Sequence, residues 1–166
     1  MRELPVRKSI RLKGYDYSQA GYYFVTLCVE GKHEILGEVD VGQGLCSCRL
    51  SDIGDIAYTE LYKLETRYEN IKIDKQVIMP NHIHVIIKIN RREQSPRPTT
   101  LMDIMCAYKS LTTKCYNKTF GISGRTIWQE RFHDIIIRNE KQYRFICQYI
   151  EENPTKWADD RYFVKK

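Results

Sequence analysis

The chain contains the stretch IKIDKQVIMPNHIHVIIK at residues 71–88. Two runs rich in β-branched residues, 71–79 and 82–88, flank Pro80 and Asn81, a pair that is typical of a turn. The sequence therefore predicts two antiparallel strands that are joined by a tight turn.

The second strand of this hairpin carries two histidines, His82 and His84. Side chains two residues apart in a strand project from the same face, so the two imidazoles lie together, while Ile83, Val85 and Ile87 project from the other face. The aliphatic face belongs in the core. The two imidazoles can then hold one metal ion or one phosphate, although two solvent-facing histidines without a ligand would give the same pattern.

The segments around the hairpin alternate between strand and helix patterns. Further strands are predicted from Tyr22 to Val29, around 34–39, and at 133–137. Helices are predicted from the N-cap Ser51 to about residue 68, from Thr100 with Asp103 as a capping box to about residue 118, and from the N-cap Asn139 to residue 152. Residues 90–98, and the segment of glycines and cysteines at 42–48, are predicted as loops.

The resulting order is β-β-α-β-β-α-β-α. Strands that are joined by tight turns favour an antiparallel sheet, and the sequence predicts an α+β, ferredoxin-like sandwich with the helices on one face of that sheet. We expect a single domain over residues 1–166, in which residues 1–20 form a basic N-terminal arm.

The composition, with 42% hydrophobic and 29% charged residues, is that of an ordinary globular protein. No apolar run approaches the roughly 20 residues of a membrane span, and the N-terminus lacks the apolar core of a signal peptide, so a cytoplasmic location is expected. The net charge of +6 favours an anionic partner such as nucleic acid. Cys46 and Cys48 are either a weak metal site or two thiols in a surface loop.

The last predicted helix carries groups that could complete a site with the histidines. Tyr149 and Asn153 are four residues apart and share one helix face. A phenol can attack phosphorus, and an amide oxygen can bind a hard cation such as Mg²⁺ or Mn²⁺. Tyr143 is a rival nucleophile on a different face of the same helix. Either tyrosine could instead be a residue that fills the core. Asn153 could also be a simple helix stop before Pro154.

Four blocks of the sequence resemble one family. Residues 79–84, MPNHIH, resemble the His-hydrophobic-His motif of the HUH nucleases, and residues 148–154, QYIEENP, resemble the tyrosine helix of the single-tyrosine HUH transposases of the insertion-sequence type. The block at 9–17 with 21–26, and the block at 128–134 with 137–140, are similar to segments of the REP-associated branch of those transposases. The four blocks occur in order over most of the chain.

This resemblance implies a ferredoxin-like fold and a divalent metal, Mg²⁺ or Mn²⁺, bound by His82, His84 and Asn153, where relatives often carry glutamine. It implies that Tyr149 cleaves single-stranded, hairpin-containing DNA through a 5′-phosphotyrosine intermediate and transfers the strand. Members of the family act as homodimers or as monomers, so both states stay open. The alternative is a catalytically idle regulator that binds single-stranded or structured nucleic acid on the same fold.

Basic and aromatic side chains are the candidates for DNA contact, because cations neutralise phosphates and flat rings stack on unpaired bases. Each could equally be a surface charge or a core residue. The candidates are Arg7, Lys8, Arg11, Lys13, Lys109, Lys114, Trp128 and Arg131.

Overall fold

The predicted hairpin supplies one edge strand and one central strand of the sheet. In the computed structural model, which describes residues 11–42, 45–91 and 98–164, it forms β4 (Ile71–Met79) and β5 (His82–Ile89). Strands β1 (Gly21–Cys28) and β6 (His133–Ile137) complete a four-stranded sheet with the order β4-β5-β1-β6, and all of its pairs are antiparallel. The α+β fold with an antiparallel sheet is confirmed.

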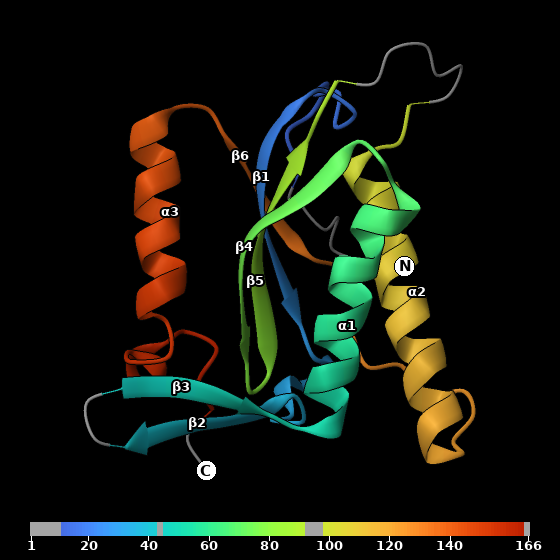
Figure 1. Ribbon diagram of the computed structural model, residues 1–166, viewed down its shortest axis with the longest axis vertical. Coiled ribbons are helices and arrows are strands. Elements are labelled where there is room, and N and C mark those ends of the chain that lie inside the picture. Colours follow the sequence, from blue (N-terminus) through green and yellow to red (C-terminus); the bar gives the residue numbers. More distant parts are fainter. Residues whose placement is uncertain (1–10, 43–44, 92–97, 165–166) are drawn as a thin grey trace, which may run out of the picture.

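The helices cover both faces of this sheet (Figure 1). Helices α1 (Asp52–Arg67) and α2 (Leu101–Phe120) lie on one face, as expected, whereas α3 (Glu140–Glu152) lies on the other. The placement of α3 therefore differs from the expectation that all helices share a face. The physical reason is that the histidine face also carries Phe24 and Ile86, which pack with the apolar side of α3 in a second, smaller core.

The segment after residue 36 forms a separate two-stranded ribbon. Strand β2 (Gly37–Gly42) pairs with β3 (Leu45–Leu50) in an antiparallel register that places Gly37 opposite Leu50. The prediction of a loop at 42–48 was wrong for residue 42 and for residues 45–48, because their backbones pair across this ribbon as strands. The Cys48 thiol lies 3.6 Å from the Met79 sulfur, and no disulfide joins the cysteines whose side chains are described.

The three predicted N-caps are confirmed. The Gly54 N–H donates to Ser51 Oγ over 3.1 Å, and the Gln142 N–H donates to Asn139 Oδ1 over 2.8 Å. Thr100 and Asp103 form a reciprocal capping box. Each cap satisfies a backbone donor that the helix itself leaves unpaired. The caps thus fix where the helices begin.

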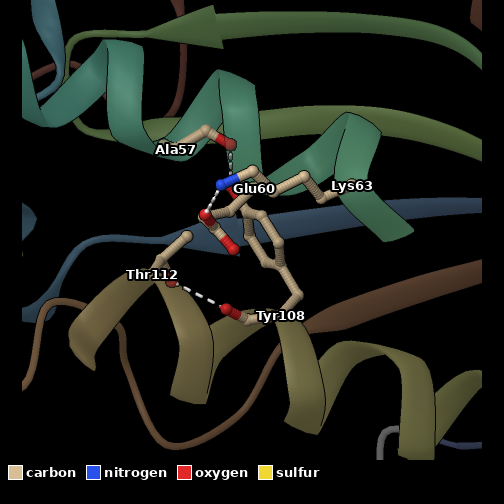
Figure 2. Close-up of polar contacts among 5 residues, drawn as sticks. All are labelled: Ala57, Glu60, Lys63, Tyr108 and Thr112. Carbon is tan, nitrogen blue, oxygen red and sulfur yellow. Dashed lines mark hydrogen bonds and ion pairs between the residues drawn. The ribbon is translucent and has the colours of Figure 1, made fainter. Parts of the chain in front are cut away.

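A hydrogen bond ties α1 to α2, and further polar contacts lie within each of the two helices. Figure 2 shows the Tyr108 hydroxyl, which is fully buried and donates to the Ala57 carbonyl of α1 over 2.9 Å, and Thr112 Oγ1, which donates to the Tyr108 carbonyl over 2.8 Å. On the same face of α1, Lys63 Nζ pairs with Glu60 over 2.7 Å. Short 3-10 turns at Glu30–Lys32 and Trp157–Asp159 complete the described structure. Among the helices in the described ranges, none has the length and apolar character to cross a membrane.

Candidate active site

The two histidines lie side by side on β5, close to the turn of the hairpin. Their Nε2 atoms are 3.1 Å apart, and their side chains are 0% and 1% exposed. Each Nδ1 atom points away from the pair toward a hydrogen-bond partner. His82 Nδ1 lies 2.9 Å from Asn81 Oδ1, and His84 Nδ1 lies 2.8 Å from Thr26 Oγ1 on β1. The imidazoles are therefore held in fixed orientations.

The hydrogen bonds of Asn81 determine the tautomer of His82. Its amide nitrogen donates to the backbone carbonyls of Lys32 and Tyr162 over 3.3 and 2.9 Å, so its Oδ1 atom faces the imidazole. An amide oxygen only accepts, so His82 Nδ1 carries the proton and the lone pair of Nε2 points toward His84. A metal-binding histidine usually donates a hydrogen bond from the ring nitrogen that does not bind the metal, as His82 Nδ1 does here.

The separation of the two nitrogens is suitable for a shared ion. Two ligands that are each about 2.1 Å from one cation, at an angle of roughly 90 to 110°, lie about 3.0 to 3.4 Å apart. The observed 3.1 Å between His82 Nε2 and His84 Nε2 falls within that interval.

Helix α3 brings Tyr149 and Asn153 to the same place. The Tyr149 hydroxyl lies 3.2 Å from His84 Nε2, and its ring is 5.1 Å from the imidazole. Asn153, the C-cap of α3, is 2% exposed, and its Oδ1 atom has no hydrogen-bond partner among the described residues. A buried, unpaired oxygen is costly, and a cation beside it would satisfy it.

An acidic residue that the sequence did not single out completes the cluster. Asp160 Oδ2 accepts from Asn153 Nδ2 over 2.9 Å and lies 3.5 Å from the Tyr149 hydroxyl. Ligand atoms of His82, His84 and Asp160 all lie within 4.8 Å of one another. Asp160 follows the last helix in an irregular turn, where no periodic pattern reveals the direction of a side chain.

The C-terminal turn covers the site. The rings of Trp157 and Tyr162 lie 5.8 and 4.5 Å from the His82 imidazole, and the Tyr162 carbonyl accepts the hydrogen bond from Asn81. Figure 1 shows this turn at the hairpin end of the sheet, below α3. Together these contacts explain why His82 and His84 have almost no exposed surface.

Burial sets the protonation of the site. It lowers the pKa of His82 to about 4 and, together with the neighbouring His82, holds the pKa of His84 well below its usual range. Both imidazoles are therefore neutral at pH 7, which is the form that binds a metal. Burial and the Asp160 carboxylate raise the pKa of the Tyr149 phenol to about 12.

The low pKa of His82 predicts acid sensitivity of the metal-free protein. The unfolded chain takes up a proton near pH 6.5, whereas the folded protein resists until about pH 4, so protonation favours unfolding between these values. In EDTA, this histidine should lower the free energy of unfolding by about 3 kcal/mol across that range. Denaturation curves of the wild type and of His82→Gln should diverge on acidification, while a variant of the exposed His133, His133→Gln, follows the wild type. Equal pH slopes for His82→Gln and the wild type would contradict the assignment.

Tyr143, the rival nucleophile, lies away from the histidines. Its hydroxyl donates to Asp74 on β4 over 2.5 Å, and its ring packs 5.2 Å from that of Tyr22. The hydrogen bond to the Asp74 carboxylate raises the pKa of this phenol. Of the two tyrosines, only Tyr149 has its hydroxyl within hydrogen-bond distance of a site histidine.

The basic candidates for DNA contact fall into three groups. Arg7 and Lys8 lie outside the described residues. Lys13, Lys114 and Arg131 are exposed, and the exposed Arg11 lies over the Phe132 ring at 5.0 Å, so DNA contact by these four stays a prediction. The ammonium group of Lys109 donates to the carbonyls of Gln129 and Glu130 over 2.7 and 2.8 Å and thereby ties α2 to the segment before β6, and DNA contact by Lys109 also stays a prediction.

Trp128 is a core residue in this structure. It is 4% exposed, its ring lies 5.8 Å from that of Tyr108, and its indole N–H donates to Thr112 Oγ1 over 2.7 Å. The expected stacking on an unpaired base would require the ring to leave the core. Sequence alone did not reveal this because Trp128 lies in an irregular segment with no strand or helix period.

The hydrogen bond of Trp128 predicts a stability effect. Thr112→Val keeps the shape of the buried side chain but leaves the indole N–H without an acceptor, which should cost about 1 to 3 kcal/mol of unfolding free energy. The neighbouring, half-exposed Thr113 provides the matched control, and Thr113→Val should change stability much less. Chemical denaturation of both variants tests this, and equal losses would contradict the role given to Thr112.

Comparison with known proteins places the chain among transposases. Residues 52–153 match the family model described as Transposase IS200 like. An uncharacterized protein of Haemophilus influenzae is 32% identical over 174 residues, which is 95% of this chain and 93% of that protein. The structure of a REP-associated tyrosine transposase bound to a REP hairpin matches with a TM-score of 0.62 and 20% identity, over 89% of this chain and 74% of that one.

A Deinococcus radiodurans crystal structure described as a candidate transposase matches with a TM-score of 0.51 and 17% identity, over 86% of this chain and 95% of that one. These two structural matches support the fold. The family match includes β5 with its two histidines and extends to Asn153 at the end of α3, and the chain belongs to the IS200-like transposase family.

Proposed function

We propose that the protein is a metal-dependent DNA strand transferase that uses Tyr149 as its nucleophile on single-stranded, hairpin-containing DNA. The observation that carries the proposal is the position of the Tyr149 hydroxyl, 3.2 Å from His84 Nε2 and beside a cluster of His82, His84 and Asp160. Core packing alone would not require the Tyr149 hydroxyl to lie beside two neutral imidazoles and a carboxylate.

The side chains present are suitable for a divalent cation. His82 and His84 would supply two nitrogen ligands, and the unpaired Oδ1 of Asn153 and the carboxylate of Asp160 would supply oxygen. The amide and carboxylate oxygens are donors that favour Mg²⁺ or Mn²⁺, the ions that we propose as cofactors. When bound, such an ion stabilises the negative charge that develops on the reacting phosphate.

The chain's own groups account for the covalent step. The Tyr149 oxygen forms a bond to phosphorus, and the bond from phosphorus to the 3′-oxygen breaks, which yields a 5′-phosphotyrosine and, after protonation, a free 3′-hydroxyl. With a pKa of about 12, the phenol must give up its proton as it attacks. Asp160 Oδ2, 3.5 Å away, is the group that we propose as the proton acceptor.

The proposed substrate is single-stranded DNA that folds into hairpins. The structural relative was solved with a REP hairpin, and the net charge of +6 of this chain favours binding to phosphates. Because the C-terminal turn covers His82 and His84, that turn has to shift when a phosphate enters. One chain supplies β5, α3 and the turn, so the proposed site does not need a second copy.

The experiment that tests the proposal is covalent trapping. Hairpin oligonucleotides with single-stranded flanks are incubated with the protein and Mn²⁺ or Mg²⁺, and the products are separated on a denaturing gel. A slow-migrating protein–DNA adduct, together with a free 3′-hydroxyl fragment and sensitivity to EDTA, is the expected result. Salt-sensitive binding without an adduct under any of these conditions would instead favour the idle regulator.

A further inference from the structure

Helix α3 leaves one of its flanks uncovered. It is tied to β4 on one side, where Tyr143 donates to Asp74 and Glu151 pairs with Lys75. Residues two apart on a helix point about 200° away from each other, so Phe145 lies on the flank opposite Tyr143. Figure 1 shows α3 alone on this side of the sheet, and that flank has no helix beside it in the described structure.

Phe145 is the most exposed large hydrophobic side chain in the described residues. Its exposed fraction is 71%, whereas the next highest, Leu12, is 48% exposed. A single exposed aromatic ring is common on protein surfaces, so the position of Phe145 relative to the candidate nucleophile, and not its exposure alone, indicates a ligand. Phe145 precedes Tyr149 by four residues, which places the ring on the same side of α3 and about 6 Å from the candidate nucleophile along the axis.

The surroundings of Phe145 combine positive charge with apolar surface. Lys141, exposed and one turn before Phe145, continues the line of side chains toward the start of α3. Ile135 on β6 is 45% exposed and stands opposite Phe24, whose ring is 6.2 Å from that of Tyr149, so it lies on the same face of the sheet. A cation, an aromatic ring and a nucleophile thus follow one another at helical-turn spacing.

We propose that Phe145 stacks on an unpaired base of the DNA strand next to the phosphate that Tyr149 attacks, while Lys141 contacts the backbone. This inference rests on the proposed function, since it assumes that single-stranded DNA is bound at Tyr149. One ring among charged neighbours is too small an apolar area for a protein interface, which needs about 1,000 Å². It is, however, the arrangement by which proteins bind single strands, namely an aromatic platform beside a cation.

Binding measurements in a Tyr149→Phe background test the inference without any chemistry. Phe145→Ala should weaken the binding of labelled oligothymidylate roughly 5- to 100-fold, and Phe145→Tyr should retain it. For an oligonucleotide of the same length made of abasic sites, Phe145→Ala should change affinity little, because the phosphates remain and the bases are gone. Phe120, which is 41% exposed at the end of α2, gives the matched control Phe120→Ala, with no expected effect on either probe.

Unchanged affinity for oligothymidylate in Phe145→Ala, or an equal loss for the abasic probe, would overturn the inference. A difference in oligomeric state between Phe145→Ala and the wild type, measured by sedimentation without DNA, would also overturn it, because Phe145 would then contact a second copy of the chain. The failure of the proposed function has a different signature. If the wild type forms no adduct but Phe145→Ala still loses base-dependent binding, the stacking site stands and the strand transfer does not.

Discussion

Tyr149→Phe is expected to form no covalent adduct with a hairpin oligonucleotide, a loss of at least about 1,000-fold in the rate of cleavage. The substitution removes one oxygen, which lies 3.2 Å from His84 Nε2, and leaves the ring that packs against Phe24. The fold and the affinity for DNA should therefore change little. Time courses of adduct formation on denaturing gels, with binding measured in parallel, separate chemistry from recognition.

Tyr143 supplies the matched control for this experiment. It lies on the same helix, but its hydroxyl donates to Asp74 and is directed toward β4 rather than toward the histidines. Tyr143→Phe should therefore form the adduct at close to the wild-type rate. If Tyr143→Phe lost the adduct and Tyr149→Phe kept it, the nucleophile would be misassigned, and mapping of the DNA-linked peptide would identify the tyrosine used.

The parts of the site that lie on regular elements were predictable from the sequence. The period of two in a strand placed His82 and His84 on one face of β5, and the period of a helix placed Tyr149 and Asn153 on one face of α3. Hydrophobic pattern and turn residues also gave the antiparallel hairpin, and cap residues gave the helix starts. These signals are local in the sequence, so they can be interpreted without any knowledge of tertiary contacts.

The remaining features depend on tertiary contacts. Asp160 reaches the histidines because the chain folds back after Pro154, and no spacing in the sequence encodes that return. Asn81 was recognised as a turn residue, but its second role, holding the His82 ring, needs the carbonyls of Lys32 and Tyr162 nearby. The side of the sheet on which α3 packs depends on Phe24 and Ile86, whose burial shows that the histidine face is also apolar.

His84→Ala is expected to abolish the stabilisation of the fold by Mn²⁺. A ligand that binds only the folded protein adds RT ln(1 + [L]/Kd), about 2.7 kcal/mol when the free ion is at 100 times its Kd. His84 is buried, its Nε2 atom lies 3.1 Å from that of His82, and its loss leaves too few donors for tight binding. The quantity to measure is the difference in denaturation midpoint between Mn²⁺ and EDTA, since the cavity left by alanine also lowers the stability of the metal-free protein.

Two oxygen-donor variants make the same measurement more discriminating. Asn153→Ala and Asp160→Asn should each reduce the Mn²⁺-dependent shift without abolishing it, because the two imidazoles remain. His133 is exposed on β6, so His133→Gln should keep the full shift and controls for loss of a surface histidine. A full shift in His84→Ala would mean that the ion binds elsewhere, and the two imidazoles would then be only a hydrogen-bonded pair inside the fold.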